Sequence, residues 1–150
     1  MEVDLEHVVA HPVQRVFGLM SDLSKRALWQ ERSSDVEVLT PGPVGLGTRW
    51  REHTRGVGDA EGEVVGFEPD ALWAERGVAD GGTAEVTVTF SPEGEEATRL
   101  GIVVRIDLRG TRRLLEPALG PAVRHQMPQD LRRLEALLAG EAGDDDRPTG

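Results

Sequence analysis

The sequence predicts an α+β fold in which one antiparallel sheet packs against a long C-terminal helix. Between residues 36 and 108, short segments of alternating apolar and polar residues are separated by turns. This spacing is typical of an antiparallel meander, whereas parallel βαβ units would need a helical segment between strands. Residues 113–139 instead carry apolar residues at helical spacing. Each pattern leaves one apolar face, and the two faces can bury each other.

The first part of the chain predicts a strand followed by two helices. Residues 2–10 alternate and form the strand, which ends at His11 and Pro12. Pro12 suits the first turn of a helix, where its missing N–H is not needed. The apolar residues that follow at helical spacing are Val13, Val16, Phe17 and Met20. Asp22 can then cap a second, short helix that carries Trp29.

Six strands are predicted after these helices, around residues 36–40, 48–55, 61–67, 72–78, 86–90 and 98–108. The connections contain Gly and Pro, as in the turn at residues 68–70, where Pro69 has a favoured position. Alternation places Phe90 on the apolar face of the fifth of these strands. Ile102 and Val104 share the apolar face of the last strand, which is the longest.

The strand at residues 48–55 indicates which of its faces is buried. One face carries three Arg side chains and His53, so we expect this face to be exposed. Side chains alternate between faces along a strand, so Trp50 and Glu52 are predicted to point inward.

The C-terminal segment predicts one long helix over residues 113–139, with Gly120 as the point where it could break. Its apolar stripe consists of Leu119, Val123, Met127, Leu131, Leu134 and Leu138. Pro117, Pro121 and Pro128 lie on the opposite side, where a curved helix has its longer hydrogen bonds and a proline costs least. Residues 140–150 are charged and poor in apolar side chains, and we predict a disordered acidic tail after a domain spanning residues 1–139.

Composition excludes several classes of function. The chain has 17 basic and 27 acidic residues and a formal net charge of −10, which disfavours nucleic acid as a partner because phosphates would be repelled. It has no Cys, and its four His lack metal-binding spacing, so no metal is expected. No phosphate or dinucleotide motif is present, so no cofactor is expected. With no signal peptide or long apolar run, we predict a cytoplasmic protein that does not insert into membranes.

Five segments resemble a known superfamily and occur in its order. They are HPVQRVFGLMSDLSKRALW, PVGLGTRWRE, VVGFEPDALWAERG, EATRLGIVVRIDLRG and DLRRLEALL. Together they make residues 2–139 similar to the START-like (SRPBCC, or Bet v 1-like) superfamily, and most of all to its polyketide cyclase/dehydrase branch. The resemblance implies a helix-grip fold of order β-α-α-β(6)-α, with a curved antiparallel sheet wrapped around the last helix. It also implies a cavity between sheet and helix that binds a small apolar or amphipathic molecule. We expect a monomer or a homodimer.

The residues expected to contact such a ligand come from the predicted inner faces of helices and strands. They are Trp29, Trp50, Glu52, Trp73, Phe90, Ile102, Val104, Val123 and Met127. The three Trp side chains combine apolar rings with a polar N–H, so they suit either a cavity wall or core packing.

Glu52 has two interpretations. A carboxylate out of water must be paired with a cation or keep its proton, and in the second state it could serve as a general acid or base. The alternative is that Glu52 lies at the mouth of the cavity, where it is either solvated or in an ion pair with Arg76 or Arg105. Three functions therefore stay open. They are non-catalytic ligand binding, a cyclase or dehydratase that uses Glu52 with Arg76 or His53, and an interaction module that resembles chaperone activators. The resemblance associates cyclases with Tyr in the pocket, and this chain has no Tyr.

Overall fold

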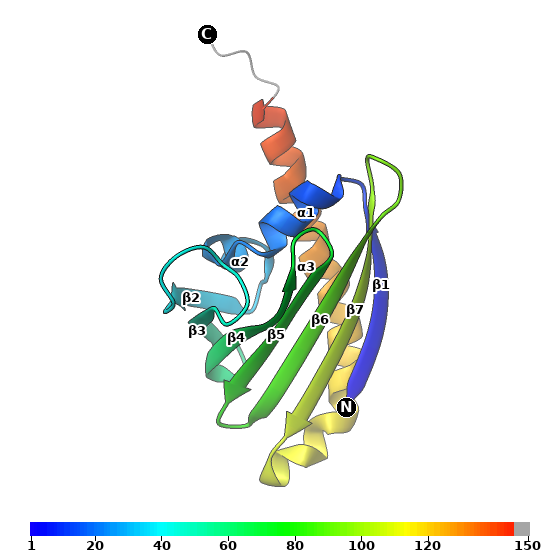
Figure 1. Cartoon of the computed structure of the whole chain (residues 1–150). Coiled ribbons are helices and arrows are strands. Elements are labelled where there is room, and N and C mark those ends of the chain that lie inside the picture. The colour runs from blue at the N-terminus through cyan, green and yellow to red at the C-terminus, as the bar shows by residue number, and fades with distance from the viewer. Residues whose placement is uncertain (146–150) are drawn as a thin grey trace.

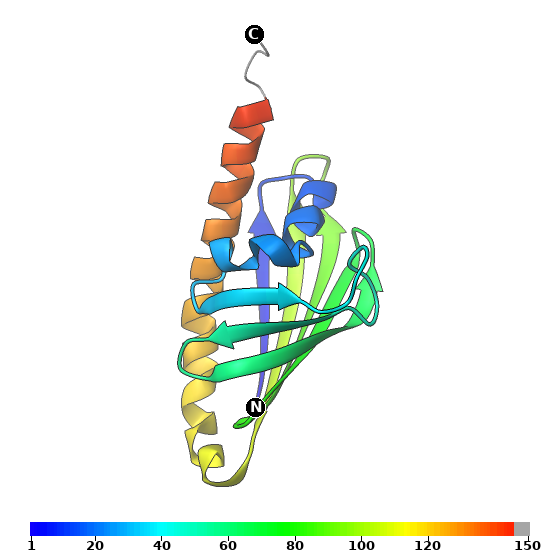
Figure 2. The same ribbon diagram turned by 90° about the vertical axis from the view of Figure 1, so that its left-hand side faces the viewer.

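The computed structural model describes residues 1–145 and contains one seven-stranded antiparallel sheet and a long C-terminal helix. The strand order is β1-β7-β6-β5-β4-β3-β2, so the first strand lies beside the last. Figures 1 and 2 show the sheet curving around one side of the helix α3. The predicted α+β helix-grip architecture is confirmed. Within the described residues, no helix is both long and apolar enough to span a membrane.

The first part of the chain forms a strand and a helical corner. The elements are β1 (Glu2–Val9), α1 (Val13–Met20), the 3-10 turn η1 (Leu23–Lys25) and α2 (Arg26–Trp29). Asp22 caps η1 by accepting a hydrogen bond from the backbone N–H of Ser24. α1 packs against α3 and β6, whereas α2 packs against α3 and β2. This corner therefore closes the space between the sheet and α3 at one end (Figure 2).

The remaining strands are β2 (Ser33–Val38), β3 (Arg49–Thr54), β4 (Gly58–Glu68), β5 (Leu72–Ala79), β6 (Gly82–Pro92) and β7 (Thr98–Leu108). β4 and β6 begin before their predicted bounds because ladder pairing continues beyond the apolar residues, for example between Ala79 and Gly82. The strand predicted at residues 36–40 is wrong at both ends. It begins at Ser33, ends at Val38 and is irregular between Ser34 and Glu37.

β3 has the predicted faces. Trp50 is fully buried and the Glu52 side chain is 12% exposed, whereas Arg49, Arg51 and His53 are exposed. Both residues therefore lie on the buried face of the sheet, as predicted.

The C-terminal helix α3 (Glu116–Asp145) follows a 3-10 segment, η2 (Gly110–Leu115). The start predicted at Arg113 is wrong because η2 occupies that stretch, and the helix does not break at Gly120. Pro121 lies inside the helix on its exposed side. The helix also continues beyond Ala139 to Asp145, into the first part of the tail predicted to be disordered. The rest of that tail, residues 146–150, lies outside the described residues.

Burial along α3 is uneven. Leu131, Leu134 and Leu138 are buried, whereas the earlier members of the stripe, such as Val123 and Met127, are only half-buried. The C-terminal half of the predicted stripe therefore packs in the core. The N-terminal half packs less closely against the sheet.

Candidate functional site

A cavity of about 190 Å³ lies between the helical corner, the sheet and α3. Its apolar wall includes Met20, Trp29, Trp73, Val88, Ile102 and Met127. Its polar wall includes Arg26, Glu52 and Glu75, which come from α2, β3 and β5. Such a mixture of apolar lining and a few placed polar groups is typical of small-molecule sites.

Arg26 is the centre of the polar wall. Its side chain is 3% exposed, and its two terminal nitrogens donate to the two carboxylate oxygens of Glu75 at 2.8 and 2.6 Å. Nη1 also donates to Oε1 of Glu52 at 3.3 Å. A bidentate pair of this kind fixes the guanidinium plane as well as its charge.

Two tryptophans hold these carboxylates. Nε1 of Trp50 donates to Oε1 of Glu52 at 3.2 Å, and Nε1 of Trp73 donates to Oε1 of Glu75 at 3.0 Å. In both strands the Trp precedes the Glu by two residues, so the two side chains lie on the same face. The Arg26 guanidinium also lies 4.9 Å from the ring centroid of Trp50, within range of a cation–π interaction.

The opposite charges of Arg26 and Glu75 stabilise each other. Burial by itself would raise the pKa of Glu75, but the charge and hydrogen bonds of Arg26, with the bond from Trp73, outweigh burial and lower it. Burial would likewise lower the pKa of Arg26, and the two carboxylates raise it instead. Both groups are therefore ionised at neutral pH.

Three buried polar atoms of this region have no hydrogen-bond partner among the described residues. They are Nε of Arg26, Nε1 of Trp29 and Oε2 of Glu52. All three side chains line the cavity. Buried polar atoms without a partner are rare in native proteins. These three atoms are inaccessible to water, so the protein itself covers them.

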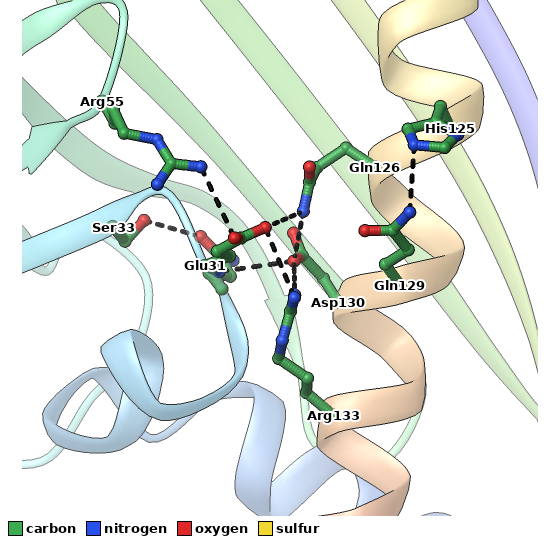
Figure 3. Close-up of polar contacts among 9 residues, drawn as sticks. Glu31, Ser33, Arg55, His125, Gln126, Gln129, Asp130 and Arg133 are labelled. Atoms are coloured by element: carbon green, nitrogen blue, oxygen red, sulfur yellow. Dashed lines mark hydrogen bonds and ion pairs between the residues drawn. The ribbon is translucent and has the colours of Figure 1, made fainter.

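A second polar cluster joins the turn after α2 to α3 beside the cavity (Figure 3). Glu31 accepts from Gln126 at 3.1 Å and pairs with Arg133 at 3.3 Å and with Arg55 at 3.5 Å. Oδ1 of Asp130 accepts from Gln126, from Arg133 and from the backbone N–H of Glu31. Since Asp130 also lines the cavity, this cluster fixes one side of the cavity wall.

The predicted site residues fall into two groups. Trp29, Glu52, Trp73, Ile102 and Met127 line the cavity. The others, which do not belong to its lining, are Trp50, Phe90, Val104 and Val123. The first three of these are buried, and Val123 is half-buried against the core.

The predicted ion-pair partners of Glu52 are wrong. Arg76 lies 3.9 Å from Glu85, and Arg105 lies 3.6 Å from Glu2. His53 faces outward and contacts Asp59 at 3.1 Å, so it does not assist Glu52. The partner is Arg26, which sequence reasoning missed. The recurrence of Trp-x-Glu, at residues 50–52 and 73–75, is a signal for the two carboxylates, and no pattern marks Arg26 as their partner.

A larger groove of about 630 Å³ is more open and is lined mainly by charged residues, including Arg51, Asp59 and Glu61. It lacks the apolar wall that a small-molecule site normally has. The described residues contain no group of three or more potential metal ligands. The smaller, buried cavity is therefore the stronger candidate site.

The fold is shared by several solved structures of low sequence identity. A protein from Thermus thermophilus is 23% identical, with a TM-score of 0.75, and the match covers 94% of this chain and 99% of that one. A START superfamily protein from Mycobacterium smegmatis is 14% identical, with a TM-score of 0.78, and the match covers 93% of this chain and 97% of that one. The Zhui aromatase/cyclase from Streptomyces sp. R1128 is 19% identical, with a TM-score of 0.74, and the match covers 100% of this chain and 98% of that one.

No curated protein sequence matches this chain. The family model for "Polyketide cyclase / dehydrase and lipid transport" matches residues 1–139, which include every residue that lines the cavity. The chain therefore belongs to the polyketide cyclase/dehydrase and lipid transport family of START-like proteins.

Proposed function

We propose that this protein binds a small apolar or amphipathic molecule in the cavity between the sheet and α3. The observation that carries the proposal is the combination of an apolar wall with the buried Arg26–Glu75–Glu52 group around one cavity. Membership of a family associated with lipid transport and polyketide cyclisation supports binding of this kind. The proposed contact residues are Trp29, Glu52, Trp73, Ile102 and Met127, together with Arg26 and Val88.

Filling the cavity tests this proposal. Val88→Phe adds volume at a buried position that lines the cavity, whereas Thr89→Phe adds it at the next, exposed position of β6. We expect the wild type and Thr89→Phe to bind a small aromatic probe such as toluene, and Val88→Phe to bind it at least about tenfold more weakly, as loss of a probe's apolar contacts implies. Native mass spectrometry of the purified protein gives a second measurement. Equal probe binding by all three proteins would refute the cavity as the site.

A cyclase or dehydratase is the second candidate, and the carboxylate of Glu52 in the lining of the cavity favours it. A carboxylate at such a position could take up a proton from a bound substrate. In that case Glu52→Gln would abolish turnover while substrate affinity stayed near the wild-type value. The third hypothesis, an interaction module, rests on resemblance alone, and we do not propose it.

A further inference from the structure

Provided that the proposed binding function is right, the occupant of the cavity can extend beyond it, because the cavity is partly open. The elements β5, β6, β7 and α3 all line the cavity and continue past it toward the β5–β6 turn and η2 (Figure 1). Burial falls in that direction. On β6, Val88 is buried and Val86 is half-buried. On α3, Leu131 is buried, whereas Met127 and Val123, one and two turns earlier, are half-buried.

Small residues form the floor of this open part. They are direct partners on neighbouring strands, with Gly62 on β4, Gly77 on β5 and Ala84 on β6. Gly77 follows Glu75 by two residues, so it lies on the face of the sheet that lines the cavity, about 7 Å further along the strand. Against the sheet, α3 packs mainly on β1 and β7, and both Gly77 and Ala84 are half-exposed.

Neither backbone conformation nor packing requires a glycine at residue 77. The φ angle of Gly77 is not positive, and a Cβ atom there would meet no other part of the protein within 4 Å. At Gly62, by contrast, the indole ring of Trp50 occupies that space. Glycine inside a strand weakens the strand and often marks a place where a ligand approaches the backbone closely. The open space above Gly77 fits that second role.

This extension of the cavity is apolar. The inward positions beyond the polar wall on β5, β6 and β7 are Gly77, Ala79, Ala84 and Ile106. The charged neighbours Arg76 and Glu85 lie on the outer face of the sheet, 3.9 Å apart. Polar groups placed on such a floor would lose hydrogen bonds to water without replacement, whereas methylene groups would gain by burial. We propose that the occupant carries an apolar chain, such as an acyl chain, which leaves the cavity over Gly77 and Ala84.

Linear alcohols of increasing length, compared with toluene, test this proposal. In the wild type, affinity should rise from 1-hexanol through 1-octanol to 1-decanol, by up to about fourfold for each methylene group that leaves water. Binding is measured by NMR titration of the ¹⁵N-labelled protein, with each alcohol below its solubility limit. The backbone amide signals of Gly77 and Ala84 should shift with 1-decanol and not with toluene.

Two variants narrow the extension from neighbouring strands. Gly77→Phe and Ala84→Phe should each weaken 1-decanol binding at least about tenfold, the loss of about two buried methylene groups, and keep toluene binding within about twofold of the wild type. Val78→Phe is the control, because Val78 is exposed on the outer face of β5, and it should weaken neither probe. Val88→Phe should weaken both, because Val88 lines the cavity itself.

The outcomes separate the extension from the binding function. If toluene binds more tightly than 1-decanol, or if neither inward variant weakens 1-decanol, the cavity binds ligands and the extension is wrong. An equal loss with Val78→Phe would also contradict it. If an inward variant changes the oligomeric state in light scattering, the floor belongs to an interface between two copies of the chain. If no probe binds, the binding function itself is refuted. Should Gly77→Phe fail to fold, Ala84→Phe and the wild-type amide signals still decide.

Discussion

The indole ring of Trp50 occupies the space next to Gly62, its cross-strand partner on β4. A Cβ atom at residue 62 would lie 2.3 Å from Cε2 and Cζ2 of that ring. Glycine is therefore required there by the close approach of the indole. This contact fixes the ring that packs against Arg26 and donates to Glu52, so Gly62 supports the polar wall of the cavity.

Gly62→Ala should destabilise the protein by about 1–3 kcal/mol, as overpacking of a core does. Gly77 is the partner of Gly62 on the other side, and a Cβ there meets no atom within 4 Å. Gly77→Ala should therefore leave stability unchanged or raise it by up to about 1 kcal/mol, because alanine lowers the conformational entropy of the unfolded chain. Urea denaturation measures the unfolding free energy of both variants. Equal losses would show that the two glycines serve strand conformation and that the Trp50 contact is unimportant.

Arg26→Met should lower the free energy of unfolding by about 3–5 kcal/mol at neutral pH. The change removes the cation and leaves Glu75 and Glu52 buried together without it. The exposed pair of Arg49 and Glu63 provides a control, and Arg49→Met should cost at most about 1 kcal/mol. A loss no larger than that of the control would mean that solvent reaches the Arg26 cluster.

The cost of Arg26→Met should also depend on pH. In the wild type the pKa of Glu75 is lowered, so its contribution to stability is complete above its ordinary value of 4.5 and is lost as pH falls through the lowered pKa. Without Arg26, burial alone acts on Glu75 and favours its protonated form. The difference in unfolding free energy between the two proteins should therefore be smaller at about pH 4.5 than at about pH 7. A constant difference would contradict the charge interpretation.

Much of the fold could be predicted because alternation and helical periodicity report which face of an element is buried. This argument correctly directed Trp50 and Glu52 inward and His53 outward. It could not supply Arg26, because periodicity does not show which distant element will cover a given strand. An Arg in a four-residue helix has the pattern of an exposed residue, and only the folded corner brings it onto β3 and β5.

The errors at element ends have a similar origin. The periodicity predicts a last helix that begins at Arg113, but η2 occupies that stretch and Gly120 is accommodated within α3. The pattern of apolar residues does not show how the backbone is hydrogen-bonded at these positions. The half-burial of Val123 and Met127 follows from tertiary packing, because both lie on the same stripe as the buried Leu131 and their spacing does not distinguish them from it.

Leu131 and Arg132 test the packing of α3 at neighbouring positions. Leu131 is 1% exposed, and Arg132 is exposed. Leu131→Ala should cost about 2–5 kcal/mol, whereas Arg132→Ala should change stability by about 0.5 kcal/mol or less. Both values come from denaturant unfolding with a common slope. Similar costs would show that the stripe of α3 does not pack against the core in solution.

Asp130 should tolerate replacement by Asn but not by Ala. Burial raises the pKa of Asp130 despite hydrogen bonds from Gln126 and Glu31 and the charge of Arg133. Ionisation therefore opposes folding, and the contribution of this group falls as pH rises through the raised pKa. Its three hydrogen bonds all end on Oδ1, an acceptor that Asn retains (Figure 3).

At neutral pH, Asp130→Asn should keep stability within about 0.5 kcal/mol of the wild type or increase it slightly, because it removes the buried charge and preserves the acceptor. Asp130→Ala should cost about 1–3 kcal/mol, because the N–H of Glu31 and the side chain of Gln126 each lose an acceptor. Thermal and urea unfolding of both variants give the comparison. If Asn costs as much as Ala, the charge of Asp130 is needed to hold Arg133, and the cluster beside the cavity depends on that ion pair more than on its hydrogen bonds.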